Sequence, residues 1–105
     1  MTGQADIQAV VRRIAAEFRP RRIVLFGSRA YGRPRPDSDV DLLVVLPFSG
    51  SPIKLAAEIV DRVNPSFSLD LVVRSPDDVE RRYKFGDPLI REAVDRGQVL
   101  YEAAA

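Results

Sequence analysis

Two aspartates separated by a single residue stand at the start of an apolar segment. Asp39 and Asp41 lead directly into residues 42–46, which are Leu-Leu-Val-Val-Leu. In a strand, residues i and i+2 point to the same face, so both carboxylates project side by side. Like charges so close repel unless a cation or a proton lies between them, and all-oxygen ligands suit Mg²⁺, or Mn²⁺ in its place. The alternative is a polar turn followed by a surface aspartate.

A third aspartate, Asp70, lies inside the apolar segment 69–73. An acid within an apolar strand costs stability unless it is paired or binds a metal. An ion pair with one of the many arginines is the alternative. If this strand lies beside the strand of Asp39, the sequence predicts a three-carboxylate metal site made of Asp39, Asp41 and Asp70.

A glycine and a serine, Gly27-Ser28, follow the short apolar segment 22–26. Glycine lets the backbone approach a ligand closely, and the amides that open a helix form an anion site. The alternative is an ordinary turn with a serine cap. Arginines 29, 33 and 35 lie between this pair and the aspartates. We take Arg29 as a phosphate-binding candidate, and for all three the alternative is a solvated loop charge.

The composition limits the chemistry that the 105 residues can perform. The sequence has no His and no Cys, which excludes a Ser-His-Asp triad, a thiol nucleophile, a Cys/His zinc site and a disulfide scaffold within it. The net charge is +1, but residues 1–36 carry eight arginines and only two acids. That basic segment could steer a polyanion such as a triphosphate, or it is a solvated surface.

The sequence points away from a membrane or nucleic-acid protein. No run approaches the ~18 apolar residues of a membrane span, and no apolar signal segment follows the N-terminus, so we expect a cytoplasmic protein. There is no Trp, and the aromatics do not alternate with the arginines, so nucleic acid ranks behind other partners.

Helices and strands alternate along the sequence and must position these residues. Apolar residues at helical spacing predict a first helix that ends at Pro20, and serine or aspartate followed by proline marks three helix starts. Gly97 is the expected C-cap of the last helix. The expected strands are residues 22–26, 39–46, 68–74 and 98–101, and the expected helices cover residues 7–18, 52–63, 76–86 and 88–96. This alternation predicts an α/β fold in which helices cover a sheet.

The motif Gly27-Ser28, ten residues, then Asp39-Val40-Asp41 resembles the signature of the nucleotidyltransferase superfamily that includes DNA polymerase beta. Asp70 fits that superfamily's third carboxylate. The single-domain length, the run Arg29-Ala30-Tyr31-Gly32 and the C-terminal segments Pro88–Ala93 and Val99–Glu102 resemble the minimal nucleotidyltransferase (MNT) subfamily. The resemblance implies an α+β type of core with a small mixed sheet flanked by helices. We expect one domain over residues 1–105, with an N-terminal helix in 1–19 and a catalytic core in 20–102.

The resemblance also implies roles for the motif residues. Members transfer a nucleoside monophosphate from a nucleoside triphosphate to a hydroxyl group. Gly27 and Ser28 would bind the β- and γ-phosphates, and Asp39 and Asp41 would hold two Mg²⁺ ions. Asp70 would ligate the ion that activates the acceptor hydroxyl and would take its proton.

MNT proteins resemble the antitoxins of two-protein modules whose toxin is a helical HEPN-type ribonuclease. The resemblance implies transfer of AMP from ATP to a tyrosine of that toxin, within a homo- or hetero-oligomer. Larger superfamily members carry a helical substrate domain that this sequence lacks, so a second chain is expected to supply the acceptor. Two alternatives stay open, an antitoxin that acts by binding alone and a nucleotidyltransferase of small molecules such as antibiotics.

Overall fold

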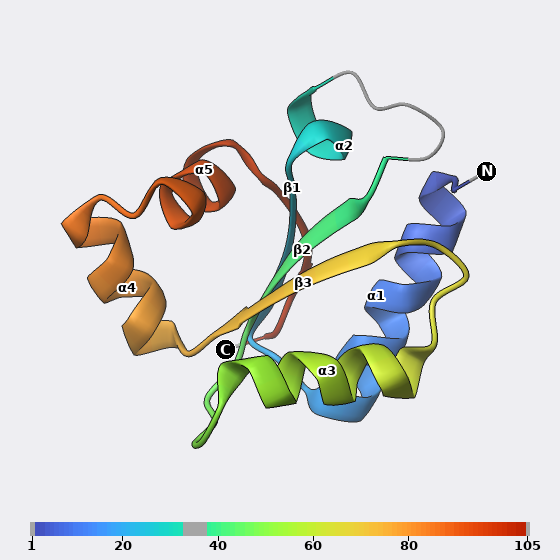
Figure 1. Ribbon diagram of the computed structural model, residues 1–105, viewed down its shortest axis with the longest axis horizontal. Coiled ribbons are helices and arrows are strands. Elements are labelled where there is room, and N and C mark those ends of the chain that lie inside the picture. Colours follow the sequence, from blue (N-terminus) through green and yellow to red (C-terminus); the bar gives the residue numbers. More distant parts are fainter. Residues whose placement is uncertain (1, 33–37, 105) are drawn as a thin grey trace.

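The fold is built on a mixed β-sheet, seen in a computed structural model that describes residues 2–32 and 38–104. Within those residues the sheet has the strand order β3-β2-β1-β4 (Figure 1). β1 pairs antiparallel with both β2 and β4, whereas β2 and β3 run parallel. The predicted mixed sheet is therefore confirmed, with bounds β1 (Arg22–Phe26), β2 (Val40–Val45), β3 (Leu69–Arg74) and β4 (Gln98–Glu102).

Helices cover both faces of this sheet. One face packs against two long helices, and the other packs mainly against a C-terminal helix, with a further helix at its margin (Figure 1). The two long helices are α1 (Gln4–Phe18) and α3 (Pro52–Val63). The C-terminal helix on the other face is α5 (Pro88–Arg96), and the helix at its margin is α4 (Pro76–Phe85). A single turn, α2 (Ser28–Tyr31), follows β1. None of the helices within the described residues is long and apolar enough to span a membrane.

Strand β2 has an apolar side chain on each face, as its sequence predicts. Leu42 and Val44 are fully buried on the side of α1 and α3, while Leu43 and Val45 are buried on the side of α5. Burial of both faces fixes the register of the strand, because a shift by one residue would exchange the two sets. The strand begins at Val40, one residue later than predicted, so Asp39 lies just before it.

Local sequence sets where the helices begin. The Ser51 and Ser75 hydroxyls each accept a backbone hydrogen bond of 3.2 Å, and the Asp87 carboxylate caps α5. A proline occupies the first turn of each of these three helices, where its missing N–H costs nothing. The helix α1 begins three residues before the predicted residue 7, because the Gly3 amide donates to the Asp6 carboxylate in a capping arrangement.

Gly97 ends α5 as predicted, but for a reason that the sequence does not reveal. Its backbone is extended, with φ −70° and ψ 167°, so no left-handed conformation is needed. A Cβ there would instead clash with the Ala93 carbonyl oxygen of α5 and lie 2.5 Å from Val24 Cγ1 and 3.0 Å from the Leu25 carbonyl oxygen of β1. Glycine at this position lets the end of α5 approach β1 closely.

Candidate active site

Asp41 and Asp70 are direct neighbours across the parallel pair of strands β2 and β3. Asp41 is half-buried and Asp70 is exposed. The pKa of Asp41 is raised to about 6, first by burial, then by the charge of the Asp70 carboxylate, which is also within hydrogen-bonding reach, and then by Asp39. The structure thus joins two of the predicted carboxylates in a pair that carries excess negative charge near neutral pH.

The position of Asp70 differs from the expectation. The sequence places it inside an apolar strand, where an unpaired acid is costly, but β3 is an edge strand and the side chain is exposed. Among residues 2–32 and 38–104 it forms no ion pair with an arginine. The repulsion between the two carboxylates is therefore seen in the raised pKa of the half-buried Asp41.

Asp39 is held just outside β2 by its neighbours. The Val40 amide donates to the Ser68 carbonyl oxygen at 2.9 Å, which attaches this end of β2 to the segment before β3. Asp39 lies close enough to raise the pKa of Asp41, but in the part of the chain that the structure describes no three acidic side chains form a ready-made metal-binding group. The predicted trio is thus a contacting pair with a third carboxylate nearby, and the metal site stays a prediction.

The donor chemistry of these residues fits divalent magnesium. All three side chains offer carboxylate oxygens, which are the ligands that Mg²⁺ prefers. A cation between Asp41 and Asp70 would relieve the repulsion that raises the Asp41 pKa.

Gly27 links the Gly-Ser loop to the carboxylates. Its φ of +77° and ψ of −159° lie in a region that is almost restricted to glycine. A Cβ at this position would clash with the Asp41 carboxylate and lie 3.0 Å from its Cγ. Phe26, the residue before it, pairs with Asp41 across β1 and β2. Gly27 and Ser28, which begins α2, therefore lie at the same end of the sheet as the aspartates.

Arg29 contacts backbone carbonyl groups on two other segments. Its Nε and Nη2 atoms donate to the Ser38 carbonyl oxygen at 3.0 and 2.9 Å, and Nη1 donates to the Thr2 carbonyl oxygen at 3.3 Å. The predicted phosphate contact of Arg29 stays a prediction. The other two arginine candidates, Arg33 and Arg35, lie outside the described residues.

α5 and α2 bring to the site two residues that were not predicted from the sequence. The Glu92 carboxylate on α5 adds to the negative field that raises the pKa of Asp41. The Tyr31 hydroxyl is buried without a partner in normal hydrogen-bond geometry among the described residues, and its burial, together with Glu92, raises the Tyr31 pKa. Arg96 covers the Tyr31 ring at 4.2 Å. Only the i, i+4 spacing of Glu92 and Arg96 could have indicated a shared helix face.

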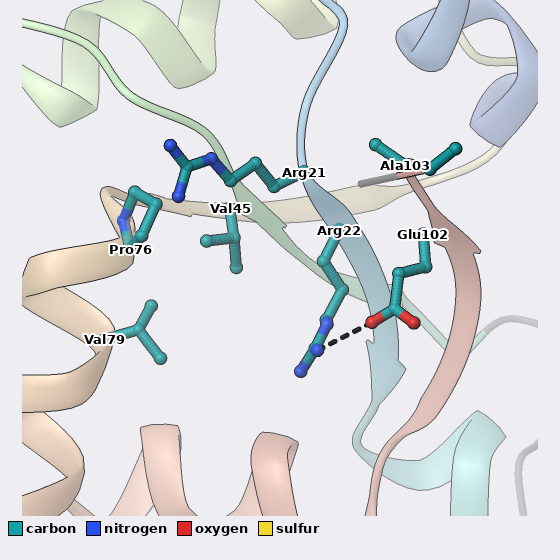
Figure 2. Close-up of a pocket in the computed structure, with 8 residues that line it drawn as sticks. Arg21, Arg22, Val45, Pro76, Val79, Glu102 and Ala103 are labelled. Carbon is teal, nitrogen blue, oxygen red and sulfur yellow. Dashed lines mark ion pairs between the residues drawn. The ribbon is translucent and has the colours of Figure 1, made fainter.

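A cavity of about 840 Å³ lies at the opposite end of the sheet (Figure 2). Arg21, Arg22 and Val45 line it, with the end of β4 and the start of α4. Arg22 there forms an ion pair of 2.6 Å with Glu102. Since β1 begins beside this cavity and ends at the Gly-Ser loop, the cavity is separate from the carboxylate site.

Comparison with known proteins identifies the family. The family model for the nucleotidyltransferase domain matches residues 7–102. The chain belongs to the nucleotidyltransferase domain family. Its matched segment contains the Gly-Ser loop and all three aspartates, so the resemblance drawn from the motif is confirmed. Comparison with curated proteins gives no significant match.

Solved structures share the fold at low sequence identity. A toxin–antitoxin complex with AMP-PNP matches with a TM-score of 0.61 and 20% identity over 91% of this chain and 73% of that chain. The toxin–antitoxin MntA-HepT matches with a TM-score of 0.59 and 17% identity, covering 96% and 74%. Spectinomycin adenyltransferase AAD(9) from Enterococcus faecialis matches with a TM-score of 0.65 and 14% identity, covering 99% and 58%.

Proposed function

We propose that this protein transfers AMP from ATP to a hydroxyl group of a partner protein, in a reaction that depends on Mg²⁺, and that it serves as the antitoxin of a HEPN-type toxin. The observation that carries the proposal is the packing of Gly27 against Asp41, which lies beside Asp70. This packing joins the predicted phosphate loop and the predicted metal ligands in one site of a nucleotidyltransferase domain.

The residues divide the work between binding the nucleotide and accepting a proton. Gly27 and Ser28 hold the β- and γ-phosphates through backbone amides and the serine hydroxyl. Asp39, Asp41 and Asp70 hold two Mg²⁺ ions, for which Mn²⁺ can substitute. When bound, such ions neutralise the triphosphate and stabilise the attacking and leaving oxygens of an in-line displacement.

Asp70 is the residue best placed to take the proton of the acceptor hydroxyl. Its side chain is exposed on the edge strand β3, where a macromolecular acceptor can approach it. Asp41 is half-buried between Asp70 and the Gly-Ser loop, so its role is to hold the nucleotide side of the site. In the net reaction the acceptor oxygen bonds to the α-phosphorus, pyrophosphate leaves, and the hydroxyl proton goes to a base.

Support for a protein acceptor comes from the toxin–antitoxin structures that share the fold, one of them solved with AMP-PNP. The test is intact-mass analysis of a HEPN-type toxin co-expressed with this protein, after incubation with ATP and Mg²⁺. We expect a gain of one or more AMP units on the partner, and no gain with Asp39→Ala or Asp41→Ala. Neutralisation of the partner without added mass would instead favour an antitoxin that acts by binding alone.

Small-molecule nucleotidyl transfer is the second candidate, because the fold is shared with a spectinomycin adenyltransferase crystallised with ATP and spectinomycin. This chain spans 58% of that protein, so in such an activity residues outside these 105 would have to complete the acceptor site. Incubation with aminocyclitol antibiotics, labelled ATP and Mg²⁺ separates the candidates, and labelled antibiotic in the absence of any partner would favour the second.

A further inference from the structure

The Arg29 guanidinium joins α2 to the segment that carries Asp39. Two of its nitrogen atoms donate to one acceptor, the Ser38 carbonyl oxygen, at 3.0 and 2.9 Å. A third nitrogen donates to the Thr2 carbonyl oxygen at 3.3 Å, which connects the start of the chain to the same guanidinium. These three hydrogen bonds use the planar fork of arginine, whose donors have fixed directions.

Asp39 is consequently fastened on both sides. The carbonyl group before it is held by Arg29, and the amide after it, that of Val40, donates to the Ser68 carbonyl oxygen at 2.9 Å. The first contact sets the distance of Asp39 from α2, and the second sets its distance from the strand that carries Asp70. Because Arg29 directly follows Ser28, the same guanidinium relates the Gly-Ser loop to the aspartate.

We propose that Arg29 is a positioning residue, which fixes Asp39 relative to the Gly27-Ser28 loop through the Ser38 carbonyl group. The proposal rests on the proposed function and deepens it. Binding of a nucleoside triphosphate with Mg²⁺ then requires the guanidinium fork itself. A positive charge at this position does not replace it, because a lysine ammonium cannot reproduce the paired donation to Ser38 together with the bond to Thr2.

The test compares Arg29→Lys and Arg29→Gln with Arg13→Gln as the control. Arg13 lies on α1, exposed and paired with Glu17, outside the site. Two quantities are measured for each variant whose melting temperature shows it to be folded. The first is the Mg²⁺ concentration that gives half-maximal binding of a non-hydrolysable ATP analogue. The second is the hydrogen-exchange rate of the amides of residues 38–40 without metal or nucleotide.

We expect Arg29→Lys and Arg29→Gln each to raise the required Mg²⁺ concentration by about 10- to 100-fold. Loss of a residue that orients a metal ligand has an effect of this size at other metal sites. Exchange at residues 38–40 should quicken in both variants. Arg13→Gln should change neither quantity.

Two results would overturn the proposal. Full recovery of Mg²⁺-dependent binding in Arg29→Lys, with unchanged exchange, would show that Arg29 acts as a charge toward the phosphates. Unchanged binding and exchange in both variants would show that Arg29 does not position Asp39. If the unmodified protein binds no nucleotide with Mg²⁺, the proposed function itself fails, and the exchange rates alone still decide whether Arg29 fixes Asp39.

Discussion

At the scale of single residues, the contact between Gly27 and Asp41 explains why the loop and the carboxylates form one site. Gly27 has a positive φ, and a side chain there would meet the Asp41 carboxylate. The positive φ of Gly27 requires the conformational freedom of glycine. The close contact with Asp41 requires in addition that this residue has no side chain. The two requirements can be separated at Gly50, which has a φ of +92° but where a Cβ would have no atom of the described residues within 4 Å.

Gly27→Ala is therefore expected to cost more stability than Gly50→Ala. A positive φ strains an alanine at either position by about 1–3 kcal/mol, and the displaced Asp41 carboxylate adds to that strain only in Gly27→Ala. Urea denaturation of both variants gives the comparison. Equal losses would mean that the Gly27–Asp41 contact has no energetic consequence.

The raised pKa of Asp41 predicts how the free energy of unfolding of the metal-free protein depends on pH. Its pKa in the folded protein is about 6, raised by burial and by Asp70 from an ordinary 3.8. The folded protein therefore holds this proton more tightly than the unfolded chain. The resulting stabilisation is complete below the unfolded pKa and is lost as the pH rises through about 6.

Asp41→Asn should remove that dependence. In EDTA at about pH 7.5 we expect this variant to gain roughly 1–2 kcal/mol over the unmodified protein, an estimate reduced for partial exposure, and to gain nothing at about pH 4. Melting temperatures at both pH values measure the effect, with Asp61→Asn on the exposed face of α3 as the matched control. A gain of the same size at both pH values would contradict the assignment.

At the scale of elements, α2 is a single turn that neighbouring elements hold in place. The Gln98 side chain at the start of β4 donates to the Ala30 carbonyl oxygen at 2.9 Å, and Arg96 of α5 covers the Tyr31 ring. Arg29 holds the other side through Ser38. A helix this short has little stability of its own, so the position of the Gly-Ser loop depends on α5 and β4.

The close packing of the end of α5 against β1 can be tested at Gly97. A Cβ there would clash with the Ala93 carbonyl oxygen of α5 and with Val24 of β1, and would crowd the Leu25 carbonyl group, so Gly97→Ala should destabilise the protein by about 1–3 kcal/mol. Gly3→Ala is the control, because the nearest atom to a Cβ there is 3.8 Å away. Thermal unfolding compares them. A Gly97 variant as stable as the control would show that the end of α5 can shift to make room for a side chain.

The element boundaries could be predicted because their signals are local. Ser51, Ser75 and Asp87 each cap a helix whose first turn holds a proline, and the apolar run of β2 predicts its burial on both faces. The sequence predicts that Asp41 and Asp70 are neighbours only if their two strands pair, because the order of strands in a sheet depends on tertiary structure. Glu92 was missed for the same reason, since it reaches the site only through the packing of α5 on β1.

At the scale of the whole molecule, the two ends of the sheet differ in chemistry. The end where β1 runs into α2 holds the carboxylates and the Gly-Ser loop, whereas the other end holds the cavity with Arg21 and Arg22 (Figure 2). The chain belongs to the nucleotidyltransferase domain family, and we propose that nucleotidyl transfer takes place at the carboxylate end. The cavity end therefore offers a control position, because Arg21 directly precedes β1 and Gly27 directly follows it.

We propose that Asp41 and its neighbours bind a nucleoside triphosphate together with Mg²⁺. Isothermal titration with a non-hydrolysable ATP analogue tests it most directly, with the unmodified protein, Asp41→Asn and Arg21→Gln, each in Mg²⁺ and in EDTA. We predict that the unmodified protein and Arg21→Gln bind the analogue in Mg²⁺ and lose most of that affinity in EDTA, and that Asp41→Asn binds weakly in both. Equal affinity for the unmodified protein and Asp41→Asn in Mg²⁺, unaffected by EDTA, would contradict the claim.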